Sequence, residues 1–216
     1  MSYGVNAPLG AVAASFAGGS TYINNTQAYQ IAPAYGTSLF QGDLVSLHNG
    51  TITQFVPSAS NAGVPTAAST LGVGVFQGCK YFTNDPTNPV QFSTYWPAST
   101  VIKTGTSITA YVYTDPNNIF DIQMNGTLAY SSIGQNATVN FATNGNTFTG
   151  TSGMVIDTVT VNYTPALVPF FPFTIIGFTP VPGNFPTSVT GTSIPYANLL
   201  VKLNSSNYIA GQTQIA

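Results

Sequence analysis

Charged side chains are almost absent from this sequence. Aspartate, glutamate, lysine and arginine together make up 4% of the 216 residues, against about 25% in a typical soluble domain. There is no arginine and no glutamate, and three lysines stand against five aspartates, for a net charge of −2. Three scattered lysines cannot form the basic surface that binds nucleic acid or anionic lipids. We therefore expect neither nucleic acid nor a membrane among the partners.

Side chains that carry out chemistry are equally scarce. The sequence holds one cysteine, Cys79, which permits no intramolecular disulfide, and one histidine, His48. One residue of each kind cannot build a zinc site of the usual composition. Cys79 follows a glycine in an apolar stretch and is interpreted as a small buried hydrophobe, whereas His48 falls in a predicted hairpin turn and is expected in solvent. We expect no enzyme, no cofactor and no bound metal.

The aspartates are the remaining option for catalysis or metal binding. Asp115 and Asp121 are the nearest pair in sequence, and paired carboxylates hydrolyse glycosides in many enzymes. Asp115 precedes Pro116, however, at a position where an Asx turn is common. The spacing of Asp115, Asn117 and Asp121 is only faintly similar to a calcium loop, because the glycine and the final glutamate of an EF-hand are missing. Turn formation is the favoured interpretation.

Long apolar runs are absent as well. The most apolar stretch, 166–178, is too short to span a bilayer and is interrupted by Pro169 and Pro172. The first ten residues lack the basic and apolar segments of a secretory signal. We therefore expect a protein made in a cytoplasm.

The residues that are present indicate a folded protein adapted to an assembly. Hydrophobic residues make up 44% of the chain and mean hydropathy is +0.20, which is too apolar for intrinsic disorder. Asn, Thr, Ser, Gln and Gly take the polar positions in place of charges. Interface cores are poor in charge and rich in aromatic residues, so a subunit of an assembly fits this composition. A charge-poor proteome of the source organism is the alternative.

Short strand-forming segments alternate with turn signals along most of the chain. Asn49-Gly50 and Asn125-Gly126 are typical of two-residue hairpin turns, and Gly72 and Gly74 within an apolar run indicate a bulge or a close approach of two backbones. No stretch of ten residues shows helical spacing, so the pattern predicts an all-β fold, an antiparallel sandwich or barrel. Strands are expected at 38–47, 51–56, 71–76, 90–96, 107–113, 119–124, 138–141, 146–150, 158–163, 173–178 and 197–203.

Composition also suggests a division of the chain into three parts. Residues 1–34 are rich in Ala, Gly, Ser and Asn without sustained periodicity, and we interpret them as an extended arm that orders on contact with a neighbour, with a short strand around 21–23. Residues 35–203 form the β body, whose pattern allows a break into two small subdomains near 130–145. Residues 204–216 are expected to be a tail, and 57–69, 84–89 and 180–195 are expected to be loops.

Two further features concern aromatic residues. The tripeptide Phe-Gln-Gly occurs at 40–42 and again at 76–78, which is too short to distinguish duplication from chance. Aromatic residues of this kind fill a β core or a subunit interface more often than they line a sugar-binding face. The candidates for such anchors are Phe76, Tyr81, Tyr95, Trp96, Tyr111 and Tyr113.

Several segments between residues 35 and 180 together resemble a known family. They occur in order and at plausible spacing, and include Gly74-Val75-Phe76-Gln77-Gly78-Cys79-Lys80-Tyr81, Tyr95-Trp96-Pro97-Ala98-Ser99-Thr100, Ala110-Tyr111-Val112-Tyr113-Thr114-Asp115-Pro116, Ile119-Phe120-Asp121-Ile122-Gln123 and Ile133-Gly134-Gln135-Asn136-Ala137. The family comprises tailed-bacteriophage virion proteins described as capsid decoration or cement proteins. Its pattern tends to be acidic at the positions of Thr114 and Ser132, so the resemblance favours packing roles over carboxylate chemistry.

The resemblance implies a structural protein on the outer surface of a phage capsid. Such a protein would bind the major capsid protein where shell subunits meet, associate with itself as a trimer or dimer, and stabilise the mature shell by mass action. The N-terminal arm could add a strand to a neighbour's sheet. The alternatives are a host-receptor or glycan-binding module on the virion, and a bacterial surface or appendage subunit, against which the missing signal counts.

Overall fold

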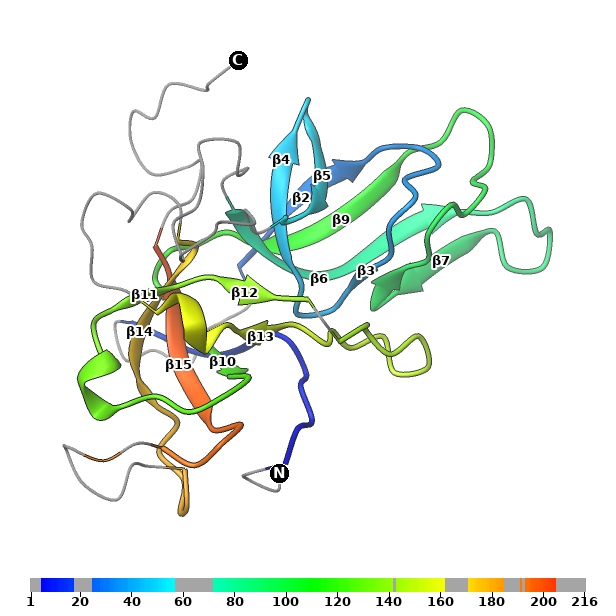
Figure 1. Ribbon diagram of the computed structural model, residues 1–216. Coiled ribbons are helices and arrows are strands. Elements are labelled where there is room, and N and C mark those ends of the chain that lie inside the picture. The colour runs from blue at the N-terminus through cyan, green and yellow to red at the C-terminus, as the bar shows by residue number, and fades with distance from the viewer. Residues whose placement is uncertain are drawn as a thin grey trace.

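The computed structural model describes residues 5–17, 25–56, 72–141, 143–161, 171–184, 191 and 193–204 (Figure 1). In this part of the chain the regular structure is almost entirely β. Helical structure is limited there to two three-residue 3-10 turns, η1 (Tyr130–Ser132) and η2 (Thr158–Thr160). The all-β prediction is therefore confirmed. No helix in the described ranges is long and apolar enough to cross a membrane.

Five strands close into a small barrel, which lies at the upper right of Figure 1. Around the ring the order is β4-β5-β2-β9-β6, and β6 pairs back with β4. All these pairings are antiparallel except the one between β2 and β5. The barrel strands are β2 (Thr26–Ile31), β4 (Leu44–His48), β5 (Thr51–Gln54), β6 (Gly72–Phe82) and β9 (Ile108–Tyr113).

Three shorter strands complete this half of the molecule. β7 (Val90–Ser93) extends the sheet from the second half of β6. β3 (Leu39–Phe40) and β8 (Tyr95–Trp96) pair with each other next to β6. β9 matches the strand expected at 107–113, and its alternation sends Ile108, Ala110 and Val112 into the barrel core. Trp96 is fully buried in the same core.

A second, antiparallel sheet has the strand order β1-β10-β15-β14-β11 and lies at the lower left of Figure 1. Its core contains Phe120 and Phe173 together with Leu44, Val75 and Tyr113 from the barrel, so the two halves share apolar packing. β12 and β13 pair with each other as a separate ribbon. The strands are β1 (Val12–Phe16), β10 (Asn118–Gln123), β11 (Asn136–Ala137), β12 (Val139–Asn140), β13 (Val155–Ile156), β14 (Phe173–Phe178) and β15 (Asn198–Leu203).

The prediction that residues 1–34 form an extended arm is wrong for two segments, β1 (Val12–Phe16) and β2 (Thr26–Ile31). β1 pairs with β10, and all six residues of β2 pair with β9 inside the barrel. Both segments are partly exposed along much of their length, and β1 contains small residues while β2 contains polar ones, so their composition suggests an arm. Sheet ladders within the chain nevertheless satisfy backbone groups on both edges of β2 and on one edge of β1. The strand expected around 21–23 lies outside the described residues.

The two predicted hairpin turns have different outcomes. At Asn49-Gly50 both residues have positive φ, 48° and 79°, as a type I′ turn requires, and β4 and β5 pair on either side. The hairpin predicted at Asn125-Gly126 is wrong. Asn125 donates its backbone N–H to the Ile156 carbonyl (3.0 Å), and its side-chain oxygen accepts from the Thr158 N–H (3.0 Å). These long-range bonds hold the chain against 155–158, and the partners of β10 are β1 and β15.

Two predicted strands are also wrong. Residues 147–150 form a turn, and 158–163 begins with η2, whose N-cap Asp157 accepts from the Val159 N–H (3.3 Å). Polar side chains that bond to nearby backbone compete with sheet pairing in both segments. Residues 162–163 and the loop 57–69 lie outside the described residues, and the described parts of 84–89 and 180–195 contain no strand.

The chain passes from one half to the other earlier than the sequence pattern suggests. β1 of the second sheet precedes β2 of the barrel, so the chain crosses a first time between these strands. β9 of the barrel ends at Tyr113 and β10 of the second sheet begins at Asn118, so the chain crosses back at 114–117. The predicted position, 130–145, contains η1, β11 and β12, all on the side of the second sheet. Of the predicted tail, Asn204 donates its N–H to the Pro172 carbonyl (2.8 Å), and 205–216 lie outside the described residues.

A substitution at Gly74 tests the close backbone approach that the sequence predicts in β6. A Cβ on Gly74 would lie 2.2 Å from the Tyr113 carbonyl oxygen. We expect Gly74→Ala to lower the free energy of unfolding by about 3 kcal/mol, because neither sheet backbone can give way. Urea unfolding measures this. The control is Gly177→Ala in β14, where nothing lies within 4 Å of the added Cβ, and equal stability losses in the two variants would contradict the packing account.

Candidate interaction surface

Four of the six predicted anchor residues lie in the core. Phe76, Tyr81, Trp96 and Tyr113 are all buried. Trp96 donates its Nε1–H to the Tyr35 carbonyl (3.3 Å), and the edge of Tyr81 meets Trp96 with 5.3 Å between ring centroids. These residues anchor the fold itself and are almost completely removed from the outer surface.

The other two predicted anchors are partly exposed. Tyr95 lies flat against the buried Phe40 ring, with 5.5 Å between centroids. Tyr111 is half-buried on β9 between buried neighbours. Of the six predicted residues, these two are therefore the ones with substantial exposure.

The cysteine and the histidine take the places that the sequence predicts. Cys79 is 2% exposed, and burial raises the pKa of its thiol to about 12. It stays protonated at neutral pH, whereas a nucleophilic cysteine acts as the thiolate. His48 is exposed at the end of β4, beside the hairpin turn.

The two aspartates singled out in the sequence serve the fold. An oxygen of Asp115 accepts from the Asn117 N–H (2.8 Å), which is the predicted Asx turn. Asp121 accepts from the Asn198 side-chain amide (2.9 Å), and burial raises the pKa of its carboxyl. Among the described residues there is no group of three or more His, Cys, Asp or Glu side chains placed to hold a metal ion.

A buried carboxyl group that the sequence analysis did not single out joins the two halves. Asp43 is 1% exposed. One carboxylate oxygen accepts from the Phe40 N–H (2.9 Å) and the Gln54 side-chain amide (3.3 Å), and the other accepts from the Ser152 hydroxyl. Burial raises the pKa of Asp43 to about 6, against the opposing effect of these donors. Asp43 therefore ties the turn before β4 to β5 and to the segment that follows residue 150.

Asp43 also lines a hollow of about 390 Å³ between the halves. A carboxyl group with a raised pKa in a cleft is a common sign of an active site. The described residues that line this hollow include no second ionisable side chain, and all the oxygens of Asp43 already accept hydrogen bonds. The geometry therefore supports a structural role for Asp43.

The segment held by Asp43 presents an aromatic side chain to solvent. Phe148 is 97% exposed. Its backbone N–H donates to the Asn146 side-chain oxygen (2.9 Å), the Gly150 N–H donates to the Asn146 carbonyl (2.8 Å), and the Asn146 N–H donates to the Thr151 carbonyl (2.8 Å). The loop from Asn146 to Thr151 is thus closed by its own hydrogen bonds and displays Phe148 at its tip.

Hydrogen bonds to Gln41 fix the base of this loop. Gln41 donates its backbone N–H to the Gly150 carbonyl (2.9 Å), and its own carbonyl accepts from the Ser152 N–H (2.9 Å). The loop was expected to be a strand from its β-forming residues. The flanking Gly145, Asn146 and Gly150 are the signal that could have indicated a turn instead.

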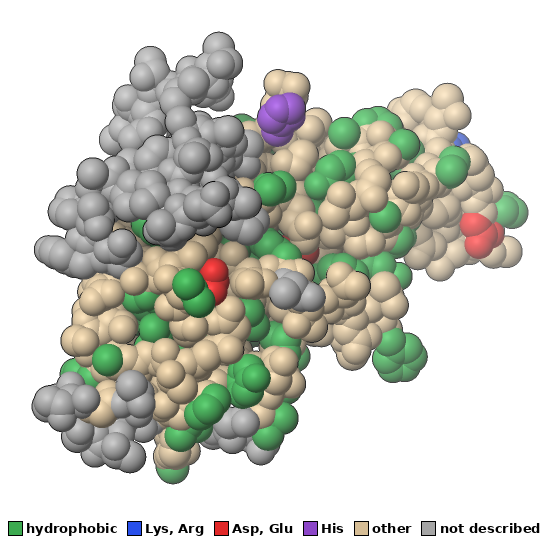
Figure 2. Space-filling model, viewed as in Figure 1, with side chains coloured by type: hydrophobic (Ala, Val, Ile, Leu, Met, Phe, Trp, Pro, Cys, Tyr) green, Lys and Arg blue, Asp and Glu red, His purple; other side chains and the backbone are tan. Residues whose placement is uncertain are grey.

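The surface around these features is apolar in places and poor in charge. Figure 2 shows apolar side chains scattered over the visible face, with few charged ones among them. Large apolar side chains that are well exposed include Phe92, Val101 and Val159 as well as Phe148. Lys80 places its ammonium group 5.5 Å from the centre of the Phe92 ring, so one of the three lysines in the chain already has an aromatic partner.

The raised pKa of Asp43 predicts how stability depends on pH. The unfolded carboxyl has a pKa near 3.8 and the folded one about 6, so between these values the folded protein holds a proton that the unfolded chain has lost. The free energy of unfolding should therefore fall by about 2 kcal/mol as pH rises from 4 to 7. In Asp43→Asn most of this fall should disappear, and a smaller fall should remain because burial also raises the pKa of Asp121. Chemical denaturation at several pH values measures both.

The matched control for this experiment is Asp85→Asn. Asp85 is exposed, and its hydrogen bonds from Thr87 lower the pKa of its carboxyl, so its effect has the opposite sign. That variant should keep the fall in stability. If the stability of Asp43→Asn falls with pH as much as that of the original chain, Asp43 is not the group that holds the proton.

Comparisons with family models, with curated proteins and with solved structures find no match to this chain. Its function is therefore inferred from its own residues, and the features that carry the inference are the charge-poor surface and the displayed side chain of Phe148.

Proposed function

We propose that this chain is a capsid decoration or cement protein of a tailed phage. It binds the outer surface of the shell where subunits of the major capsid protein meet, and it stabilises the shell by linking them. The protein has no catalytic role in this proposal, and its copies associate with one another as trimers or dimers. Its place is the outer surface of the virion, after synthesis in the host cytoplasm.

The observation that carries the proposal is the display of Phe148. Burial of a water-exposed phenylalanine side chain against a partner protein lowers the free energy of the complex. Aromatic residues are also common among the residues that dominate binding. The loop from Asn146 to Thr151 is already ordered by hydrogen bonds, so little conformational entropy is lost when it binds. A preformed loop with an exposed aromatic tip supports a role in protein–protein contact.

The lack of charge supports the same role. Only eight residues in 216 are Asp, Glu, Lys or Arg, counting three cations and five anions, and among them Asp43 is buried. Polar and apolar contacts must then provide the binding energy. Such binding changes little with salt concentration, because few charges are available to screen.

The structure narrows the mechanism that the sequence suggests. β2 is paired with β5 and β9 inside the barrel, so the segment 26–31 is not free to add a strand to a neighbour's sheet. β1 pairs with β10 and lies at the edge of its sheet. In this proposal the central contact with the shell is made by an exposed side chain, Phe148.

The copy number of the protein in purified virions tests the proposal. Quantitative mass spectrometry against the major capsid protein should give a ratio within a small factor of the capsid protein. A few copies per particle would indicate instead a tail position or a receptor-binding role, and absence from the particle would overturn the proposal.

Substitution of Phe148 tests the contact itself. Phe148→Ser should change the free energy of unfolding by no more than about 0.5 kcal/mol, as surface substitutions do, and should weaken binding to undecorated capsids at least about tenfold. Sedimentation of the protein with capsids measures the binding. Val101→Ser, at a side chain 78% exposed and outside the loop, is the control, and equal binding by both variants would remove Phe148 from the contact.

A further inference from the structure

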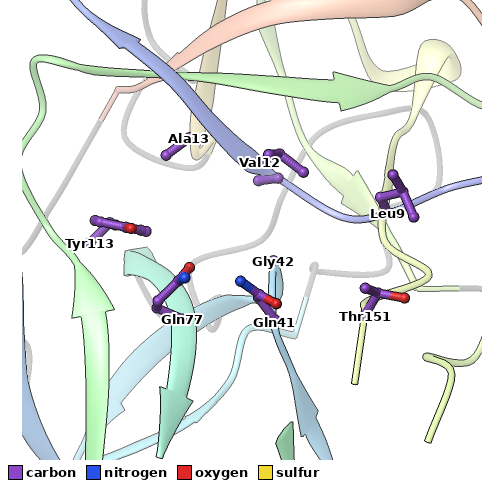
Figure 3. A pocket seen from close by; sticks show the side chains of 9 residues that line it. Leu9, Val12, Ala13, Gln41, Gly42, Gln77, Tyr113 and Thr151 are labelled. Atoms are coloured by element: carbon purple, nitrogen blue, oxygen red, sulfur yellow. The ribbon is translucent and has the colours of Figure 1, made fainter. Parts of the chain in front are cut away.

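A crevice separates β1 from the barrel on the side where the two halves meet (Figure 3). Its volume is about 360 Å³, at the lower end of the range for sites that bind small molecules. The chain from Leu9 to Ala13 crosses above it, and Gln41 and Gln77 lie below. Sites for small ligands occur preferentially at such junctions between parts of a protein.

The repeated tripeptide Phe-Gln-Gly builds the floor of this crevice. The two copies are neighbours, because Gly42 donates its N–H to the Phe76 carbonyl (2.8 Å). Phe40 and Phe76 are both buried, while both glutamines line the crevice. Each copy therefore buries its phenylalanine and leaves its glutamine at the crevice.

Local backbone geometry turns each glutamine toward the crevice. The pairing of β6 with β9 shifts register between Phe76 and Gly78, so Gln77 is the extra residue of a bulge, and bulges redirect side chains. At the other copy, Gly42 has a φ of 95° and accepts from the Ala11 N–H (2.9 Å). A Cβ on Gly42 would lie 2.9 Å from the Leu9 carbonyl oxygen, so glycine lets the N-terminal segment pass over the floor.

The polar groups of the crevice suit a ligand without charge. The side-chain amides of Gln41 and Gln77 make no hydrogen bond to any described residue, and each offers two N–H donors and a carbonyl acceptor. Tyr113 and Thr151 add hydroxyl groups to the lining. No Asp, Lys or His lines the crevice, so nothing there favours a phosphate, a carboxylate or a cation.

The upper wall of the crevice is apolar. Leu9 and Val12 come from the segment that crosses it, and both are partly exposed. An apolar wall facing two carboxamides matches a molecule that has C–H groups on one side and hydroxyl groups on the other.

We propose that this crevice binds a neutral saccharide of one or two sugar units. Its hydroxyl groups pair with the carboxamides of Gln41 and Gln77, and its C–H face lies against Leu9 and Val12. Of the aromatic residues that the sequence offers for sugar binding, Tyr81 and Trp96 are buried in the barrel core and take no part, whereas Tyr113 lines the crevice. The inference does not depend on the role of the protein in a capsid.

Titration of the intact, ¹⁵N-labelled chain with D-glucose, D-galactose, N-acetyl-D-glucosamine and maltose at millimolar concentrations tests the inference. We expect at least one sugar to shift the side-chain amide signals of Gln41 and Gln77 together with backbone signals of 9–13, in a saturable way. Absence of any shift with all four sugars would overturn it, as would shifts spread over the surface.

Variants identify the groups that bind. Gln41→Ala and Gln77→Ala should each weaken binding about three- to tenfold, the effect of losing one or two hydrogen bonds, while the remaining amide spectrum stays unchanged. Gln30→Ala, at an exposed glutamine of β2, is the control and should bind as the original chain does. Saturable binding that neither crevice variant weakens would place the sugar elsewhere and refute the assignment.

Discussion

The buried carboxyl group of Asp43 is the constraint on which the functional features depend. Its oxygens accept hydrogen bonds from the Phe40 backbone, from Gln54 on β5 and from Ser152. These partners belong to the barrel and to the segment that leads into β13. Burial of a carboxylate costs free energy unless hydrogen-bond donors surround it. Here the donors come from both halves of the molecule, so Asp43 holds the two halves together. The raised pKa shows that the donors offset burial only in part.

The same junction orders both proposed binding features. Gln41, two residues before Asp43, bonds through its backbone to Gly150 and Ser152, which fixes the base of the loop that displays Phe148. Gln41 and Thr151 are partners in an isolated β-bridge. Both residues line the crevice. A change that loosens Asp43 would therefore disturb the displayed aromatic residue and the floor of the crevice together.

Amide side chains do in this protein much of what ion pairs do in others. Asn125 joins β10 to the Asp157 region, with its amide donating to Asp157 (3.1 Å) and its oxygen accepting from Thr158. Asn184 accepts from the Asn198 N–H (2.8 Å) and donates to the Asn198 carbonyl (2.7 Å). An amide can donate and accept at once, and its burial costs less than that of a charge. Side-chain amide hydrogen bonds can therefore link distant segments of a chain that has almost no charged residues.

The sequence by itself determined the local structure wherever local stereochemistry decides it. Asn49-Gly50 takes the positive φ values of a type I′ turn, Asp115 forms its Asx turn, β9 alternates, and Cys79 is a buried hydrophobe. Each of these follows from a few neighbouring residues, and so does the all-β class.

The tertiary structure decided whatever depends on partners distant in sequence. Residues 12–16 and 26–31 became strands because β10 and β9 satisfy their backbones, and Asn125-Gly126 lost its hairpin to bonds with 156–158. Phe76, Tyr81, Trp96 and Tyr113 moved from candidate interface to core for the same reason. The Asp43 junction joins residues more than a hundred positions apart, and the crevice needs two Phe-Gln-Gly copies side by side. No local pattern encodes such distances, since they arise only when the sheets close and pack.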